Sequence, residues 1–290
     1  MSSILGVGIA ALDIINLVTD YPPEDSEIRA LEQRICRGGN VTNTLVVLSQ
    51  CQHQCAWGGV WVNNPYSQPI LTDLKKHAID LRYCQIEITG NMPTSYITLN
   101  QRNGSRTIIH YRNLPEFSFA SFQKIPLAHF DWLHFEGRNV QETYQMLQYV
   151  QQHFPQLTVS LEVEKPRVDI ERLFDKVDVL LFAQEFAKVH GYVNAFDFLS
   201  AIRRYTTRAQ LVCAWGTEGG YALDKTDKFY ANPAYVPPRV VDTIGAGDTF
   251  NAGIINSLCR GNNLQTALNQ ACQLAGKKCG QIGLSELNRS

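Results

Sequence analysis

Long hydrophobic runs are missing from this 290-residue sequence. No stretch reaches the roughly 18 consecutive apolar residues that a membrane-spanning helix requires, and the start, Met1-Ser2-Ser3-Ile4, lacks the basic and apolar regions of a signal peptide. An excess of charge is also missing, since 26 Lys and Arg residues face 27 Asp and Glu residues. We therefore expect a cytoplasmic protein with neither a membrane nor a nucleic acid as partner.

Cysteine is sparse and follows no metal-binding or disulfide pattern. The eight cysteines contain no Cys-x-x-Cys pair, and the seven histidines show no metal-ligand spacing. We expect reduced thiols and no structural zinc. With 44% apolar and 18% charged residues, the composition is that of a globular protein, and residues 1–290 are interpreted as a single domain.

Two common nucleotide-binding motifs are absent as well. No Gly-Lys-Ser/Thr of a Walker A motif follows a glycine-rich loop. Gly6-Val7-Gly8-Ile9-Ala10-Ala11 fits a dinucleotide fingerprint, but its glycines fall inside a predicted strand, Ile4 to Ala10. A β-rich stretch follows instead of a helix, so no helix N-terminus is available for a pyrophosphate.

One stretch near the C-terminus stands out, Val241-Asp242-Thr243-Ile244-Gly245-Ala246-Gly247-Asp248-Thr249-Phe250-Asn251. Its three small residues, 245–247, allow a tight turn, and the apolar residues that follow recur at helical spacing up to Leu258. A loop that leads into a helix presents free N–H groups, which favour phosphate. The sequence therefore predicts an anion-binding turn here.

Asp248 is unexpected in such a turn, because a carboxylate repels phosphate. Asp is a preferred N-cap residue, so Asp248 can cap the helix. Alternatively, its carboxylate accepts a proton from an attacking hydroxyl while the N–H groups stabilise a phosphoryl group in transfer. The two roles can coexist, and the sequence leaves both open.

Two motifs identify a family. Asp242 to Phe250 resembles the C-terminal signature of the ribokinase-like (PfkB) carbohydrate kinases, and Arg37 to Asn43 resembles their N-terminal signature. Longer runs resemble one branch of the family, which phosphorylates D-fructose. These runs are residues 21–29, 136–139, 162–167 and 275–280. The similarity covers nearly the whole chain and keeps the motifs in order.

The resemblance implies a ribokinase-like α/β fold, with a central mostly parallel sheet, helices on both faces and a small β-sheet lid. The sequence itself favours a parallel sheet, because predicted strands and helices alternate. The strands are expected at 56–62, 132–135, 158–163, 177–182 and 211–214, and the helices at 70–77, 141–153, 195–204, 250–258 and 264–279. Ligands of such sheets bind beyond the carboxyl ends of the strands.

The lid is expected from about 11–35 and 93–115. Its clearest part is a hairpin in which Thr94 to Asn100 and Ser105 to Tyr111 flank Asn103-Gly104, a type I′ turn signal. Closure of a lid excludes water from the reaction. By resemblance, such lids clasp each other in a homodimer, and Arg106 reaches the ATP phosphates; without the family, Arg106 is a solvated strand residue.

The expected sugar site combines residues from both motifs. Asp13 follows the first predicted strand, where it can accept the hydroxyl protons of a diol or serve in a turn. Asn40 and Asn43, three residues apart, can share one face of a helix, and Asn40 is also a candidate N-cap. The family's sugar-binding residues correspond to Asp13, Gly39, Asn40, Asn43 and Asp248.

The expected nucleotide site includes a second turn. Trp215 to Gly220 follows a predicted strand, and its family counterpart binds ATP. That role is carried over to Gly216, Thr217, Glu218 and Gly219.

The metal positions are less clearly defined by the family pattern. Many relatives place Asn-x-x-Glu near a magnesium ion, whereas this chain has Ala183-Gln184-Glu185-Phe186, so only Glu185 is a candidate, through water. Asp242 and Thr243 match positions that bind a monovalent cation such as K⁺ in several relatives; a β-turn is the alternative.

The resemblance implies transfer of a phosphoryl group from ATP, with Mg²⁺, to the C1 hydroxyl of D-fructose. Asp248 is then the general base, and Arg106 and the amides of Gly245, Ala246 and Gly247 stabilise the transferred charge. Two alternatives remain. One is a kinase of the family for another sugar or a nucleoside, and the other is a regulatory protein that binds sugar and nucleotide without turnover.

Overall fold

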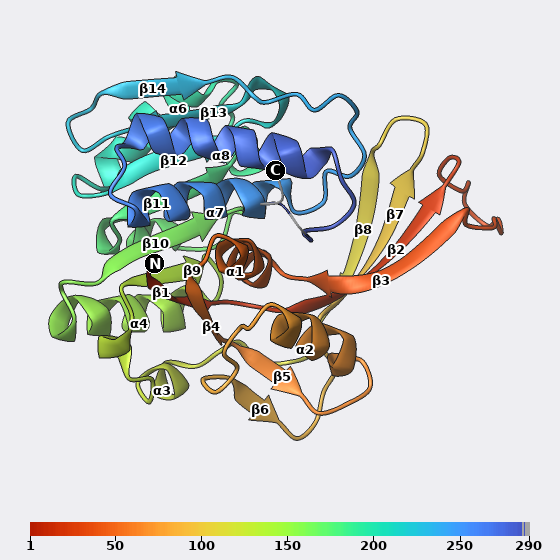
Figure 1. The fold of residues 1–290 in the computed structure, drawn as a ribbon, viewed down its shortest axis with the longest axis horizontal. Helices are drawn as coiled ribbons and strands as arrows, with labels where there is room; N and C mark the ends of the chain where they lie inside the picture. The colour runs from red at the N-terminus through yellow and green to blue at the C-terminus, as the bar shows by residue number, and fades with distance from the viewer. Residues whose placement is uncertain (286, 288–290) are drawn as a thin grey trace.

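An eight-stranded sheet forms the centre of the computed structural model, which describes residues 1–285 and 287 (Figure 1). Its order is β14-β13-β12-β11-β10-β9-β1-β4. The six strands that run parallel are β4 (Gln54–Gly58), β1 (Ser3–Val7), β9 (Trp132–Glu136), β10 (Thr158–Val163), β11 (Val179–Ala183) and β12 (Gln210–Ala214). The last two, β13 (Gly220–Leu223) and β14 (Phe229–Asn232), add an antiparallel edge.

Helices cover both faces of this sheet, because the chain crosses it in two directions. From β1 it moves outward to β4, and from β9 it moves the opposite way through β10 and β11 to β12. Right-handed crossovers then place the connecting helices on opposite faces. One face carries α1 (Asn40–Gln50), α7 (Ala246–Cys259) and α8 (Leu264–Cys279), and the other carries α4 (Val140–His153), α5 (Gln184–Val189), α6 (Ala195–Ile202) and the short α3 (Phe119–Phe122). The expected α/β architecture is thus confirmed.

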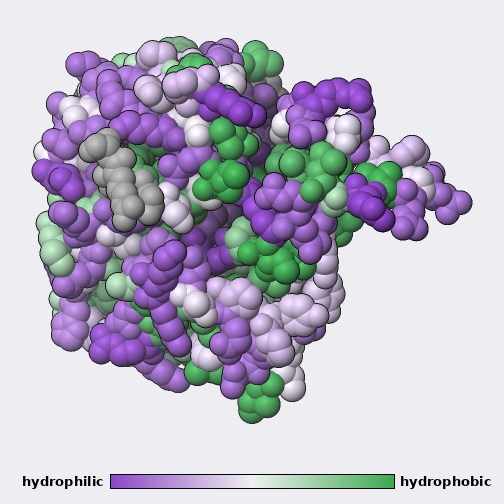
Figure 2. Space-filling view, turned by 45° about the vertical axis from the view of Figure 1, so that its right-hand side comes forward, coloured by the Kyte–Doolittle hydropathy of each residue, from purple (hydrophilic) through white to green (hydrophobic). Residues whose placement is uncertain are grey.

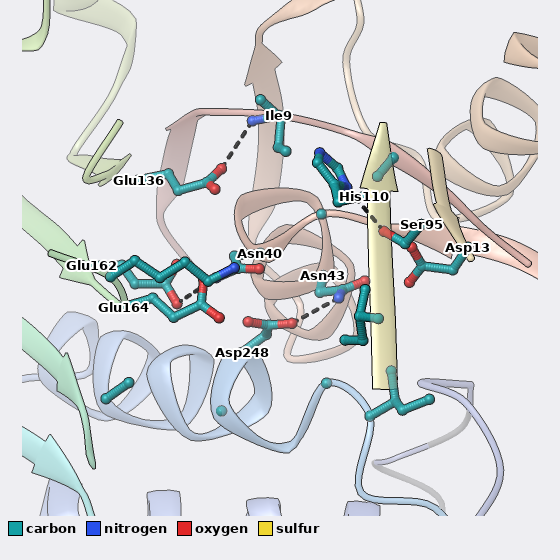
Figure 3. Close-up of a pocket in the computed structure, with 18 of the residues that line it drawn as sticks. Ile9, Asp13, Asn40, Asn43, Ser95, His110, Glu136, Glu162, Glu164 and Asp248 are labelled. Carbon is teal, nitrogen blue, oxygen red and sulfur yellow. Dashed lines mark hydrogen bonds and ion pairs between the residues drawn. The ribbon is translucent and has the colours of Figure 1, made fainter. Parts of the chain in front are cut away.

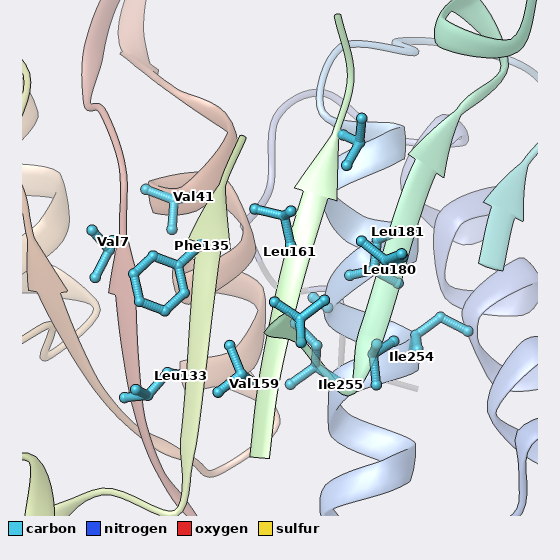
Figure 4. Packing of buried hydrophobic residues seen from close by; sticks show 14 of the residues in the cluster. Val7, Val41, Leu133, Phe135, Val159, Leu161, Leu180, Leu181, Ile254 and Ile255 are labelled. Carbon is cyan, nitrogen blue, oxygen red and sulfur yellow. The ribbon is translucent and has the colours of Figure 1, made fainter. Parts of the chain in front are cut away.

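The core lies between the sheet and its helices. Val179, Leu180, Leu181 and Phe182 of β11 are all at most 3% exposed, as expected for a parallel strand that is covered on both faces. Figure 4 shows such strand residues packed beside side chains of α1 and α7, among them Ile254. Four short 3-10 segments complete the body: η1 (Leu127–His129), η2 (Ile170–Lys176), η3 (Arg203–Tyr205) and η4 (Gly216–Glu218).

A second sheet projects from the body as an arm, at the right of Figure 1. Its order is β3-β2-β7-β8, with bounds β2 (Ala11–Val18), β3 (Glu32–Gly38), β7 (Thr94–Asn100) and β8 (Arg106–Tyr111). Strands β2 and β7 are parallel and the outer pairs are antiparallel. The helix α2 (Ser67–Lys76) packs against β2 and β3 of the arm, and the parallel pair β5 (Val60–Val62) and β6 (Gln85–Glu87) lies at the bottom of Figure 1.

Three local predictions were wrong. The strand expected from Ile4 to Ala10 ends at Val7, and the stretch expected from 56 to 62 is divided between two sheets. The hairpin turn is not of type I′, which requires positive φ at both central residues. Only Gly104 has positive φ, at 69°, because the Asn103 side chain instead accepts a hydrogen bond from the Ser105 N–H at 2.9 Å within a longer loop.

No helix within residues 1–285 and 287 combines the length and apolar character needed to cross a membrane.

Candidate active site

A cavity of about 500 Å³ lies where the carboxyl ends of the parallel strands face the small sheet. The structure brings most of the predicted site residues into its lining. They are Asp13, Gly39, Asn40, Asn43, Arg106, Thr243, Gly245, Ala246, Gly247 and Asp248. Figure 3 shows the acidic and amide side chains from α1, α7 and the strand ends pointing into one space.

Asp248 lies in the first turn of α7, and its carboxylate faces α1. Its Oδ2 accepts a hydrogen bond from Asn43 Nδ2 at 2.7 Å (Figure 3). Gly245 is the N-cap residue, and no side chain caps the helix, so the capping role that the sequence left open for Asp248 is not observed. The carboxylate can therefore accept a second hydrogen bond, from a ligand hydroxyl in the cavity.

The surroundings of Asp248 make it a weak acid. The pKa of Asp248 is raised to about 7, mainly by burial and also by the nearby carboxylates of Glu164 and Glu136, while the Asn43 hydrogen bond and the charge of Arg37 oppose the rise. Burial also raises the pKa of Glu162 well above its ordinary value, with the charge of Asp248 as the next cause. A general base works best when its pKa lies near the working pH.

Asn40 joins two glutamates at the carboxyl end of β10, one within the strand and one directly after it. Its Nδ2 donates to Glu162 Oε1 at 3.0 Å and to Glu164 Oε2 at 3.1 Å. Asn40 is the first residue of α1 and Gly39 is its N-cap residue, so the prediction that Asn40 caps the helix was wrong. The physical reason is that the turn at Gly39, with φ 101°, ends one residue earlier than expected, so Asn40 already belongs to the first turn of the helix and its side chain points to the two carboxylates.

Gly39 lets the chain enter α1 beside the cavity. Its φ is 101°, and a Cβ at this position would lie 2.4 Å from the carbonyl oxygen of Ile9. Only glycine fits this close approach and this backbone conformation. The backbone of the N-terminal motif can therefore reach a ligand without an intervening side chain.

Asp13 faces the cavity from the small sheet. It lies within β2 rather than after a strand, so it is not a turn residue as one interpretation of the sequence had it. Burial raises the pKa of Asp13, while a hydrogen bond from Ser95 and the charges of Arg37 and Arg34 lower it. Its position opposite Asp248 suits a hydroxyl-rich ligand between them.

The turn before α7 presents backbone donors. Gly245 has φ 80°, and the Ala246 N–H is used by the Thr243 carbonyl oxygen at 3.2 Å. The N–H groups of Gly245 and Gly247 donate to no acceptor among the described residues. Arg106 lies across from them and donates to Thr243 Oγ1 at 3.3 Å. This corner of the cavity can hold an anion.

Asp242 lies outside the cavity lining, and its carboxylate already has partners. Its Oδ1 accepts from the Ile244 N–H at 2.9 Å, and its Oδ2 accepts from Arg34 Nη2 at 2.9 Å and lies 3.3 Å from Lys278 Nζ. The buried Lys278 ammonium also donates to the Asp242 carbonyl oxygen at 2.6 Å. A monovalent cation held directly by this carboxylate does not fit, because a backbone N–H occupies Oδ1 and two cationic side chains occupy Oδ2.

The second predicted nucleotide segment is not part of the lining. Gly216 to Glu218 form η4 directly after β12, at the same edge of the sheet. A Cβ on Gly216 would lie 3.4 Å from the Gln184 side chain, next to Glu185, which does line the cavity. The start of the segment thus lies close to Gln184, one residue before a lining residue.

Sequence reasoning missed several charged residues of the lining: Glu136, Arg138, Glu162, Glu164, Lys165 and Arg167. All of them stand at or after the ends of β9 and β10, where the parallel-sheet rule predicts ligand contacts. The position of the acids after two predicted strands was the signal that could have identified them. Glu136 also fixes the chain after β1, since its Oε2 accepts from the Ile9 N–H at 3.0 Å.

The carboxylates of the cavity fit a magnesium ion that is bound together with a nucleotide, whose phosphates supply part of its ligands. Among the described residues, no group of three or more His, Cys, Asp or Glu side chains is arranged to hold a metal ion alone. Mg²⁺ commonly takes one or two carboxylates, with water and phosphate completing its shell. Glu164 and Glu185 face the cavity and can supply them.

Known proteins resemble this chain along its whole length. The profile of the pfkB family carbohydrate kinases matches residues 1–289. Mouse ketohexokinase is 43% identical and covers 97% of each chain, and a fructosamine kinase of Bacillus subtilis is 25% identical over 85% of this chain and 84% of its own. In fold, the structure of ribokinase from Giardia lamblia superposes with a TM-score of 0.86 at 14% identity, covering 99% of this chain and 97% of that one.

Proposed function

The chain belongs to the pfkB family of carbohydrate kinases, and from this premise we propose that it transfers the γ-phosphoryl group of ATP to the C1 hydroxyl of D-fructose. The mouse relative is a ketohexokinase, and D-fructose is a ketohexose. One observation carries the proposal. The Asp248 carboxylate, held by Asn43 at 2.7 Å, shares one cavity with the sugar-facing groups Asp13 and Asn40 and with the turn before α7.

The proposed reaction is a direct transfer between two oxygens. Asp13, Asn40 and Asn43 bind the sugar hydroxyls so that the primary hydroxyl points at Asp248. As the sugar oxygen forms its bond to the γ-phosphorus, its proton passes to the Asp248 carboxylate and the bond between the γ-phosphorus and the bridging oxygen of ADP breaks. The N–H groups of Gly245 and Gly247, with Arg106, stabilise the charge on the transferred group.

The proposed nucleotide site extends from this turn to η4, with Gly216, Thr217, Glu218 and Gly219 at its outer end. Mg²⁺ bound to ATP supplies charge neutralisation there. Glu164 and Glu185 are the residues that would hold it, directly or through water.

K⁺ is a proposed cofactor only through the family resemblance at Asp242 and Thr243, because the Asp242 carboxylate does not offer it a direct ligand. Since the Asp242 carboxylate is taken by Arg34 and Lys278, no step of the transfer depends on this ion. Activity measured in KCl and in tetramethylammonium chloride of equal ionic strength tests the requirement. Equal rates would mean that the Lys278 ammonium suffices.

We also propose a homodimer in which the small sheets of two copies pack together, because one face of this sheet exposes a row of apolar side chains. Strand register places Ile35, Ile14, Tyr96 and Ile109 in one row across all four strands. Three of them are 48–69% exposed, and Figure 2 shows green, apolar surface on this arm. Exposed apolar faces of this kind mark interfaces. A second copy supplies a matching row, and Ile109→Glu should convert the dimer to a monomer in sedimentation analysis.

The cytoplasm is the proposed location. None of the eight cysteines forms a disulfide in the part of the chain that the structure describes, and reduced thiols persist in reducing compartments. Recovery of the activity in the soluble cytosolic fraction of the source cells is the expected result, and its enrichment in an organelle would contradict it.

The test of the function is a substrate panel with ATP and Mg²⁺. D-fructose should be turned over with the highest kcat/KM, and NMR of the product should locate the phosphate at C1. A clear preference for ribose or a nucleoside would assign another activity within the family. Binding of ATP and fructose in calorimetry without product would indicate a regulatory protein instead.

A further inference from the structure

Arg37 links the outer surface of the protein to the candidate general base. It lies in β3, and only 3% of its side chain is exposed. Its Nε donates to Asp73 Oδ2 on α2 at 2.7 Å, and its Nη1 donates to Asn43 Oδ1 on α1 at 2.5 Å. Asn43 Nδ2 in turn donates to Asp248 Oδ2 at 2.7 Å. Four side chains from four elements thus form one continuous line of hydrogen bonds.

We propose that Arg37 is a positioning residue for phosphoryl transfer, which fixes the Asn43 amide so that its NH₂ group holds the Asp248 carboxylate towards the sugar. The inference rests on the proposed role of Asp248 as general base. It goes beyond that role because Arg37 does not line the cavity and reaches it only through Asn43.

The direction of the line follows from what each group can donate. A guanidinium has only donors, so it must face the Asn43 oxygen, and the amide hydrogens of Asn43 are then left for Asp248. Without Arg37, the amide can rotate and present its oxygen to the carboxylate, which removes the hydrogen bond. The family motif explains why an asparagine stands at position 43. Arg37, at the start of the same motif, determines which way the Asn43 amide points.

Asp73 keeps Arg37 in place from the other side. The Asp73 side chain is 34% exposed at the surface of α2, whereas the Arg37 side chain is 3% exposed and its guanidinium bonds to residues of α1 and α2. A buried charge needs a partner with good geometry, and Asp73 with Thr42 Oγ1, 3.4 Å from Nη1, supplies it. Arg37 is therefore held in one orientation before any substrate binds.

A pH profile can detect this role because the charge of Arg37 and the hydrogen bond from Asn43 both act on the pKa of Asp248. Both Asn43 and Arg37 lower the pKa of Asp248, while burial and neighbouring carboxylates raise it. Arg37 also lowers the pKa of Asp13, so the second experiment below, which couples Arg37 to Asp248 directly, distinguishes a shift that comes from Asp13. The remaining charged groups of the lining are Arg106, Glu136, Arg138, Glu162, Glu164, Lys165, Arg167 and Glu185, with His110 on the small sheet.

The first experiment compares Arg37→Gln with Arg82→Gln on the intact protein. Arg82 also forms a close pair with an aspartate, Asp80, but its side chain is 79% exposed and far from the cavity. The acidic limb of kcat/KM should move up by about half to one pH unit in Arg37→Gln, with kcat about 10-fold lower and the KM for ATP unchanged. Arg82→Gln should match the parent. An unmoved limb in Arg37→Gln overturns the proposal.

The second experiment needs no substrate, so it separates failure of this inference from failure of the proposed function. Urea midpoints are measured for Arg37→Gln, Asp248→Asn and the double variant at pH 8 and pH 5. The shifts should be non-additive at pH 8, where Asp248 is ionised, and additive at pH 5, where it is protonated. Additive shifts at both pH values would show a purely structural arginine and overturn the proposal. If Arg37→Gln does not fold, Arg37→Lys replaces it in both experiments. It keeps the charge but not the two-armed donor geometry of the guanidinium, so smaller shifts of the same sign are expected, and their absence overturns the proposal.

Discussion

Replacement of Asp248 by asparagine should make the protein more stable and less active at once. Asp248 is 8% exposed, and burial is the main cause that raises its pKa to about 7. A folded-state pKa above the unfolded value means that folding is opposed once the carboxylate ionises. The penalty is absent below the unfolded pKa and is complete above about pH 7.

The size of this effect follows from the two pKa values. A rise from 3.8 to about 7 corresponds to about 4 kcal/mol of unfolding free energy at pH 8. An asparagine keeps an acceptor oxygen for Asn43 and carries no charge. We therefore expect Asp248→Asn to gain about 1 to 4 kcal/mol at pH 8, and close to nothing at pH 4. Its kcat should fall by about 10²- to 10⁴-fold while sugar and ATP still bind.

Urea unfolding of both proteins at pH 8, 6 and 4, with kinase activity at pH 8, is the assay. Asp175→Asn is the matched control, because the Asp175 side chain is 54% exposed and should change neither property. A variant that loses stability equally at every pH would refute the reasoning that Asp248 is a strained buried acid. A variant with full activity would refute its role as general base.

Two further substitutions test the surroundings of the site. Gly39→Ala should lower the unfolding free energy by about 2 to 3 kcal/mol, because its φ of 101° is strained for alanine and its Cβ would lie 2.4 Å from the Ile9 oxygen; a urea midpoint equal to that of the parent would contradict this. Lys278→Met should lower stability by about 3 to 5 kcal/mol in thermal unfolding, because it removes the buried partner of Asp242. The neighbouring Lys277→Met is the control, and equal melting temperatures would show that the buried ammonium is dispensable.

Local sequence patterns predicted the elements well where the signals were strong. The helix expected from 264 to 279 is α8, Leu264–Cys279, and the strand expected from 158 to 163 is β10, Thr158–Val163. Apolar runs and helical periodicity depend on neighbours in the chain, so they are legible in a single sequence. The predictions failed at turns, as at Asn103, where a side-chain hydrogen bond decided the conformation.

The candidate site was predicted in part, and the missing part has a common cause. The residues within the two glycine motifs line the cavity as expected, but Glu162 and Glu164 lie 122 and 124 residues from the Asn40 amide that they bind. No local pattern marks such partners. Likewise, the sequence suggested a cation beside Asp242, whereas the fold brings Lys278 there from a position 36 residues later.

The sequence by itself determined the family, the α/β class and the loop that leads into α7, because motif spacing and apolar periodicity are properties of consecutive residues. Only the tertiary structure decided which side chains of the site form hydrogen bonds with one another. Asn43 and Asp248 are 205 residues apart and meet because α1 and α7 pack on the same face of the sheet. Strand order and helix packing set that distance, and through it the pKa of the acid and the part that Arg37 plays in holding it.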